Sequence, residues 1–219
     1  MENIGDTILN KFLGDCFADK DNLTLKREFG IVWEKEVKIT IVRHGKVNMK
    51  WPKKCSSDEF DMACTQYDRS GLEDIDSIPF EKHVGRIYVS KLSRSVDTAK
   101  SLFPNNEYYE MPEIGEVPLK SFRNTKKRLP LWIWNVCGRV QWYIGSERQS
   151  EKRKDTIERA NKVIDLCESM NDDCVLVTHG FFMKTMTRAL KNRGYLLTGN
   201  NQLEIKNLQV IRAEKANRI

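Results

Sequence analysis

The stretch ITIVRHGKV, residues Ile39 to Val47, joins an apolar run to a charged tip. Its first four residues are all β-branched, which favours a buried β-strand. An arginine, a histidine and a glycine follow at positions 43 to 45. In open α/β sheets ligands bind where a strand ends and the chain turns. The stretch therefore predicts either a strand that simply reaches the surface or a strand tip that presents chemistry.

Two further strand-to-helix junctions carry similar residues. The stretch SKLSRSVDTA at 90–99 puts Arg94 in the first turn of a predicted helix, and VTHGFF at 177–182 puts His179 between a predicted strand and a helix. In a parallel sheet such junctions lie at the same edge. We therefore expect Arg43 and His44 to converge with Arg94 and His179, although they are far apart in sequence.

The rest of the chain alternates between strand and helix patterns. Strands are predicted at Val37–Val42, Arg86–Ser90, Cys174–Thr178 and Glu204–Ile211, and helices at about Phe60–Tyr67, with Asp58 as a candidate start, Ser93–Leu102, Ser150–Met170 and Phe181–Lys191. This alternation predicts a three-layer α/β sandwich with a mainly parallel sheet and helices on both faces. We expect one domain over residues 37–219, with an amphipathic helical extension over 1–36 and a small cap insertion at about 120–149.

Composition places the chain among ordinary globular proteins. Of 219 residues, 40% are hydrophobic and 31% are charged, and no run approaches the roughly 20 apolar residues that a membrane span needs. The N-terminus is acidic and lacks a long apolar run, which argues against a secretory signal. The six cysteines show neither metal-ligand spacing nor a disulfide framework, so we expect a reducing, cytoplasmic setting.

The net charge of +6 is concentrated in one segment. Residues 120–159 hold eleven Lys or Arg and four Asp or Glu, which suits an anionic small molecule, a nucleic acid or a membrane surface. We interpret the Trp-rich run at 129–144 as a packed cap helix rather than a membrane anchor. No HxxxH, HExxH, P-loop or GxGxxG motif is present, so neither a metal nor a nucleotide cofactor is expected.

The predicted cluster of two arginines, two histidines and a helix N-terminus describes a phosphate pocket. A guanidinium can bind a phosphoryl group with two parallel hydrogen bonds, helix N-termini attract anions, and a histidine ring nitrogen can act as a nucleophile. The alternative is that each histidine is only structural. His83 lies in a polar stretch and is interpreted as a surface histidine.

Arg43-His44-Gly45, the 90–99 stretch and His179-Gly180 resemble, in order, the three signature blocks of the histidine phosphatase superfamily, also called the phosphoglycerate mutase-like family. The resemblance implies a metal-independent phosphatase in which His44 becomes a phosphohistidine. It also implies that Arg43, Arg94 and His179 hold the phosphoryl oxygens, with His179 counted among the catalytic residues.

The resemblance also implies a general acid after the second block, where EIGEVPL offers two carboxylates. We prefer Glu116 and keep Glu113 as the alternative. Val47 and Lys50 stand where mutase-like members usually carry Thr or Ser and Asn, which weakens a mutase interpretation. The lysines at 50, 53 and 54 are candidates to attract an anionic substrate.

The expected function is hydrolysis of a phosphomonoester. The alternatives are a phosphomutase of the same fold and a non-catalytic protein that binds a phosphate ligand. The expected partner is an anionic phosphorylated small molecule, with neither nucleic-acid nor membrane contact anticipated.

Overall fold

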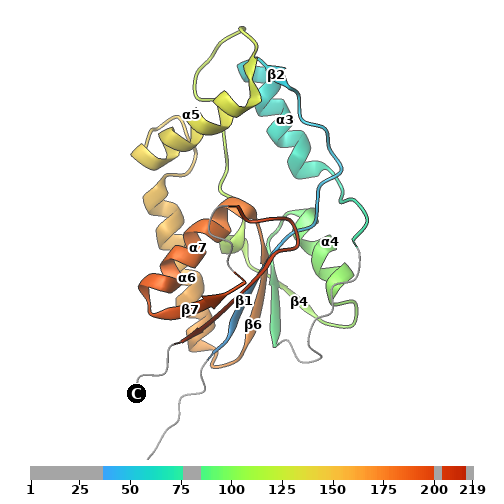
Figure 1. Cartoon of the computed structure of the whole chain (residues 1–219), viewed down its shortest axis with the longest axis vertical. Coiled ribbons are helices and arrows are strands. Elements are labelled where there is room, and N and C mark those ends of the chain that lie inside the picture. The colour runs from blue at the N-terminus through green and yellow to red at the C-terminus, as the bar shows by residue number, and fades with distance from the viewer. Residues whose placement is uncertain (1–36, 76–84, 200–203, 216–219) are drawn as a thin grey trace, which may run out of the picture. The chain divides into compact units, whose positions relative to one another are not determined.

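The computed structural model describes residues 37–75, 85–199 and 204–215 (Figure 1). The predicted N-terminal extension and His83 lie outside these ranges. The strands are β1 (Ile39–Arg43), β2 (Lys54–Cys55), β3 (Arg86–Val89), β4 (Tyr108–Glu110), β5 (Leu129–Pro130), β6 (Cys174–Thr178), β7 (Tyr195–Thr198) and β8 (Val210–Lys215). The helices are α3 (Ser57–Arg69), α4 (Ser93–Leu102), the 3₁₀ turn η1 (Pro112–Ile114), α5 (Leu131–Ile144), α6 (Arg153–Ser169) and α7 (Gly180–Asn192).

The main sheet has the strand order β4-β3-β6-β1-β8-β7. Strands β4, β3, β6 and β1 run parallel, whereas β8 is antiparallel to both β1 and β7. Arg43 lies opposite Thr178, and Val89 lies opposite Val177. The three strands that precede the sequence blocks therefore end at the same edge of the sheet.

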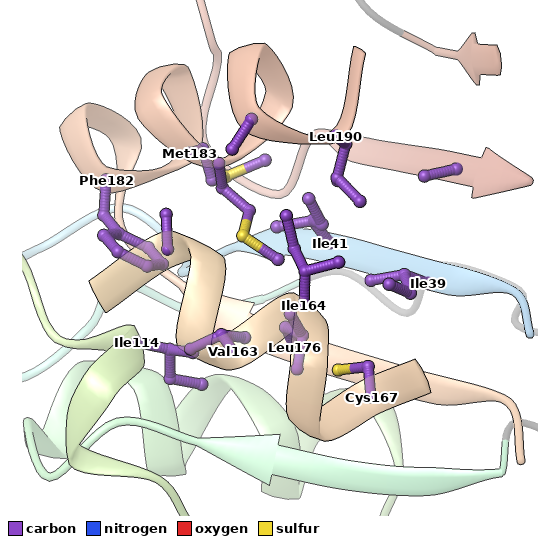
Figure 2. Close-up of a cluster of buried hydrophobic side chains, with 14 of the residues drawn as sticks. Ile39, Ile41, Ile114, Val163, Ile164, Cys167, Leu176, Phe182, Met183 and Leu190 are labelled. Carbon is purple, nitrogen blue, oxygen red and sulfur yellow. The ribbon is translucent and has the colours of Figure 1, made fainter. Parts of the chain in front are cut away.

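One face of the sheet packs against α6 and α7. Figure 2 shows Ile39 and Ile41 of β1 and Leu176 of β6 in a cluster with Ile164 of α6 and Met183 of α7. All five side chains are fully buried. Because side chains alternate across a strand, the intervening residues of these strands belong to the other face.

The opposite face packs against α4 (Figure 1). Val42 of β1 and Val177 of β6 form a second buried cluster with Ala99 and Leu102 of α4. Strand β6 is buried along its whole length, as expected for a central strand covered on both faces. The predicted three-layer sandwich, mainly parallel with helices on both faces, is confirmed.

A small lobe holds β2, β5, α3 and α5, at the top of Figure 1. Strands β2 and β5 form a two-stranded antiparallel sheet. The rings of Phe60 and Trp134 stack 5.5 Å apart, and Nε1 of Trp134 donates to the Cys55 carbonyl at 3.0 Å. The 120–149 segment supplies β5 and α5, and the lobe also includes β2 and α3, which the sequence did not group with it.

One predicted strand is wrong over most of its length. The strand expected at Glu204–Ile211 begins only at Val210. Leu208 has a φ of 59°, its N–H donates to the Arg43 carbonyl at 3.1 Å, and the Ile205 carbonyl accepts from the Arg43 side chain. Contacts with the end of β1 thus replace the strand pairing that the alternation predicted.

The start of α3 and two edge strands also differ from expectation. Ser56, not Asp58, caps α3: its Oγ accepts from the Glu59 N–H, while the Glu59 carboxylate accepts from the Ser56 N–H at 2.8 Å. This reciprocal capping box is a common helix start. Strands β4 and β7, which lie at the two edges of the sheet, are not predicted from the sequence.

The described cysteines, at 55, 64, 137, 167 and 174, are free thiols. Within the described ranges, no helix combines the length and the apolar character needed to cross a bilayer. The cytoplasmic setting stays a prediction.

Candidate active site

The sheet brings two histidines together at the ends of neighbouring parallel strands. His44 follows β1 and His179 follows β6, and the His44 N–H donates to the Thr178 carbonyl at 2.9 Å. The centroids of the two imidazole rings are 5.1 Å apart. Both side chains are buried, with exposed fractions of 1% and 0%. Residues 135 positions apart are thus in contact, as parallel-strand topology predicts.

The hydrogen bond of His44 defines its tautomer. Its Nδ1 lies 2.6 Å from the Gly45 carbonyl oxygen. Because a carbonyl can only accept, Nδ1 carries the proton and Nε2 keeps a free lone pair. Burial lowers the pKa of His44 to about 3 against the raising effect of the Gly45 bond, and Arg94 and Arg43 lower it further. His44 is therefore neutral at physiological pH and offers an unprotonated Nε2.

His179 holds the opposite tautomer. Nε of Arg94 lies 3.2 Å from its Nδ1, and a guanidinium cannot accept, so this Nδ1 is unprotonated. The proton lies on Nε2, 2.7 Å from the Ser90 Oγ. Burial lowers the pKa of His179 well below its ordinary value, and the neighbouring Arg94 adds to this effect. Two neutral imidazoles of opposite tautomer therefore face each other in the pocket.

Arg94 is buried in the first turn of α4, where a cation opposes the helix dipole. Its Nη1 donates to Asp68 Oδ1 at 2.9 Å, and its Cζ lies 4.9 Å from the centroid of the Tyr67 ring. Asp68 lies on α3 with its side chain half exposed. Its carboxylate supplies the compensating charge, so the position of Arg94 does not by itself require a ligand.

Arg43 has a buried guanidinium atom without a partner. Its Nη1 donates to the Ile205 carbonyl, but its Nε has no hydrogen-bond partner. A buried unpaired donor costs about 1–3 kcal/mol. A Cβ on Gly180 would lie only 2.9 Å from this Nε. The glycine after His179 therefore leaves the room that the Arg43 side chain occupies.

The two candidate acids occupy different places. The Glu116 carboxylate accepts from the main-chain N–H groups of Val117 at 2.8 Å and of Phe182, in the first turn of α7, at 3.1 Å. Glu116 also borders the same cleft as Arg94. Glu113 is exposed and is not among the described residues that line this cleft. The structure thus places Glu116, and not Glu113, beside the pocket.

Two further residues hold the loop after β1. The Gly45 N–H donates to Thr98 Oγ1 at 2.9 Å. Asn207 Nδ2 donates to the carbonyls of His44 and Gly45 at 3.0 and 3.1 Å. These bonds orient the carbonyl that fixes the His44 tautomer. Thr98 lies in the second sequence block, at 90–99, and could have been proposed from the sequence. Asn207 lies outside all three blocks, so no sequence pattern indicates its role.

A cleft of about 600 Å³ opens beside Arg94 and Glu116. Its other walls come mainly from α3 and α5 of the small lobe. The rings of Trp51 and Tyr67 lie 5.2 Å apart on this wall, and the Tyr67 ring is 6.5 Å from that of His44. Tyr67 therefore lies between the cleft and the buried histidines.

Other sequence-based candidates lie elsewhere. Val47 is buried and pairs with Leu72 in an isolated bridge, so it packs in the core. Lys50, Lys53 and Lys54 are exposed and are absent from the described lining of the cleft. In the described part of the chain, no group of three or more His, Cys, Asp or Glu is arranged to hold a metal ion.

A solved structure of a phosphatase shares the fold at low sequence identity. A mycobacterial glucosyl-3-phosphoglycerate phosphatase in complex with VO3 matches with a TM-score of 0.52 and 16% identity, over 80% of this chain and 90% of that chain. A phosphoserine phosphatase mutant from Entamoeba histolytica in complex with phosphoserine gives a TM-score of 0.48 and 17% identity, over 80% and 89%. Curated proteins gave no match.

A family model covers most of the sequence. Residues 39–217 match the model of the histidine phosphatase superfamily (branch 1). This span includes all three strand-end blocks, which the fold gathers around His44 and His179. The chain therefore belongs to the histidine phosphatase superfamily.

Proposed function

We propose that this protein hydrolyses a phosphomonoester, without a metal ion, through a phosphohistidine at Nε2 of His44. Family membership supports a reaction of the phosphatase or mutase type. The observation that carries the proposal is the hydrogen bond from His44 Nδ1 to the Gly45 carbonyl. It leaves Nε2 unprotonated in a buried, neutral ring, which is the state that a nucleophile needs.

In the first step, the Nε2 lone pair of His44 attacks phosphorus and the bond to the leaving oxygen breaks. The ring then carries phosphorus on Nε2 and keeps its proton on Nδ1, so it gains positive charge. The Gly45 carbonyl accepts from Nδ1 and stabilises this charge. In the second step, water attacks phosphorus, the P–N bond breaks, and His44 returns to its neutral form.

Positive charge and N–H donors stabilise the phosphoryl group as negative charge moves over its oxygens. We assign this role to Arg43 and Arg94, joined by His179. Arg43 contributes a buried Nε that lacks a partner. A phosphoryl oxygen that accepted from this atom would remove the cost of the unpaired donor.

Glu116 is the proposed general acid and base. It would give a proton to the leaving alcohol in the first step and take one from water in the second. Its support is its place on the same cleft as Arg94. The N–H groups of Val117 and Phe182 fix its carboxylate, so its position is set before substrate binds.

Rapid-quench trapping with a ³²P-labelled phosphomonoester tests the proposal. The wild-type protein should form an adduct that is labile in acid and stable in base, as expected of a phosphohistidine. His44→Ala should remain unlabelled, and His83→Ala is the matched control that should label normally. Labelling that persists in His44→Ala would show that the nucleophile is another residue.

Product analysis separates the alternatives. Hydrolysis releases inorganic phosphate and the free alcohol in equal amounts. A phosphomutase would return the phosphoryl group to an organic acceptor, and a binding protein would release neither product. Stoichiometric release of phosphate from p-nitrophenyl phosphate and from a panel of phosphorylated metabolites is the expected result.

A further inference from the structure

Helix α5 exposes a continuous apolar stripe. Trp132, Val136, Val140, Tyr143 and Ile144 are all more than half exposed, and Ile144 reaches 70%. At 100° per residue these positions span an arc of about 120° on the helix and a length of about 18 Å. Large contiguous apolar patches on a protein surface mark interaction sites.

The opposite face of α5 already has a packing role. Trp134 and Trp142 are buried, and Trp142 donates from Nε1 to Thr156 Oγ1 at 3.0 Å. The packed cap helix expected from the sequence therefore accounts for these two tryptophans. It does not account for Trp132, whose exposed fraction is 64%.

Cations border the stripe. A shallow apolar groove beside Val136 and Val140 and a larger groove between α6 and α7 share Trp142, Tyr143 and Phe181 in their walls. The larger groove also contains Arg153, Lys184, Arg188 and Lys191. Arg153 lies over the Tyr143 ring, 4.8 Å from its centroid. Lys184 and Arg188 form no ion pair with any described residue.

The sequence of α5 and of the segment before it is also basic, and the first carboxylate after α5, Glu147, forms an ion pair with Lys152. From position 117 to 146 it contains six Lys or Arg and neither Asp nor Glu. The face therefore suits a ligand that carries negative charge and also covers an apolar strip about 18 Å long.

We propose that this face binds the surface of an anionic lipid bilayer, with α5 parallel to the membrane plane. Its apolar residues would enter the boundary between headgroups and acyl chains, and the flanking cations would meet anionic headgroups. Tryptophan and tyrosine suit this boundary because each joins an apolar ring to a polar atom. The proposal does not depend on the reaction at His44.

Two other occupants fit the observations less well. A symmetric contact with a second copy would bring the same cations against one another, because a two-fold interface pairs a patch with itself. A nucleic acid offers phosphates to the cations but no apolar surface for Val136, Val140 and Ile144. The lipid surface supplies both kinds of contact.

Vesicle flotation with the full chain tests the proposal. The probes are phosphatidylcholine vesicles with and without about one third phosphatidylserine, at low and high salt. The wild-type protein should float only with the anionic vesicles, and high salt should weaken binding. The double variant Trp132→Ser/Val140→Ser should lose at least about tenfold in affinity, whereas Leu196→Ser, equally exposed on β7, should bind normally.

A charge variant gives a second readout. Each Lys or Arg near an anionic membrane contributes about fivefold in affinity. Lys184→Glu/Arg188→Glu should therefore bind the anionic vesicles at least about 30-fold more weakly than the wild-type protein. Arg86→Glu/Lys100→Glu, with both cations exposed elsewhere, is the control. Turnover of p-nitrophenyl phosphate and far-UV circular dichroism verify that each variant is folded.

Several outcomes would overturn the proposal. They are absence of wild-type binding to anionic vesicles, equal binding to neutral vesicles, or unchanged binding by either α5-face variant. A lipid-free dimer that Trp132→Ser/Val140→Ser converts to a monomer, combined with no vesicle binding, would assign the face to a second copy instead.

Discussion

The neutral state of His44 has a measurable effect on stability. Its pKa is about 3 in the folded protein and about 6.5 in an unfolded chain. Below pH 6.5 the unfolded state therefore binds a proton that the folded state does not. The free energy of unfolding must therefore fall as the pH decreases from 6.5 towards 3. Above pH 6.5 His44 is neutral in both states, so this loss of stability is absent there.

The size of the effect at pH 5 follows from these two values. At pH 5 a histidine with a pKa of 6.5 is roughly 97% protonated, whereas one with a pKa near 3 is almost fully neutral. The free energy of unfolding should thus fall by about 2 kcal/mol between pH 8 and pH 5 because of His44 alone.

The assay compares urea unfolding of the wild-type protein and His44→Gln at pH 8 and pH 5. Buffers must lack phosphate and sulfate, because a bound anion would favour the charged imidazole. Other titrating groups, including His179, are present in both proteins. The wild-type protein should therefore lose about 2 kcal/mol more than the variant. Equal losses would refute the neutral His44, and with it the argument that Nε2 is ready to attack.

Three further predictions concern the chemistry. Glu116→Gln should slow hydrolysis of an alkyl phosphate by about 10²–10⁴-fold but that of p-nitrophenyl phosphate much less, since its phenolate leaves unaided; a leaving-group dependence in Glu113→Gln instead would transfer the role. Turnover should persist in excess EDTA, and complete loss that Mg²⁺ or Zn²⁺ restores would contradict the mechanism. Gly180→Ala should displace Arg43 and lower kcat/KM by about tenfold or more. The Tm should change little, because the flexible Arg43 side chain can move. An unchanged kcat/KM would contradict the role of Arg43 in binding the phosphoryl group.

Elements that depend on local pattern could be predicted from the sequence. Strand β6 and helix α4 have the predicted bounds, Cys174–Thr178 and Ser93–Leu102. A continuous apolar run between polar loops predicts a central strand, and the parallel-strand rule then places His44 beside His179. The prediction for residues 204–209 failed because Asn207 and its neighbours contact the end of β1 instead of pairing as a strand.

Residues that support the pocket through side-chain contacts could not be predicted. Asp68 lies 26 positions from Arg94, on another helix, and nothing in the pattern of α3 distinguishes it from a solvated carboxylate. Ser90 lies within a recognised block, but its bond to His179 depends on the positions of two separate strands. Such contacts form only after the strands pair, so they cannot be predicted from local sequence patterns.

If His179 holds a phosphoryl oxygen, as proposed, its present hydrogen bonds must change. Its Nδ1 accepts from Arg94 and its Nε2 donates to Ser90, so neither ring nitrogen has a free N–H. For Nδ1 to donate to a phosphoryl oxygen, Arg94 must release this nitrogen. The ring must then either gain a proton or move its proton from Nε2 to Nδ1, with the Ser90 hydroxyl donating to Nε2. The released Nε–H of Arg94 then becomes available to the same anion. The negative charge of a phosphoryl group would favour the protonated ring, because it opposes the burial and the cationic neighbour that lower the pKa of His179. In the proposed mechanism, phosphate binding therefore rearranges the hydrogen bonds of His179, and Asp68 keeps Arg94 in place while its inner hydrogen bond changes partner.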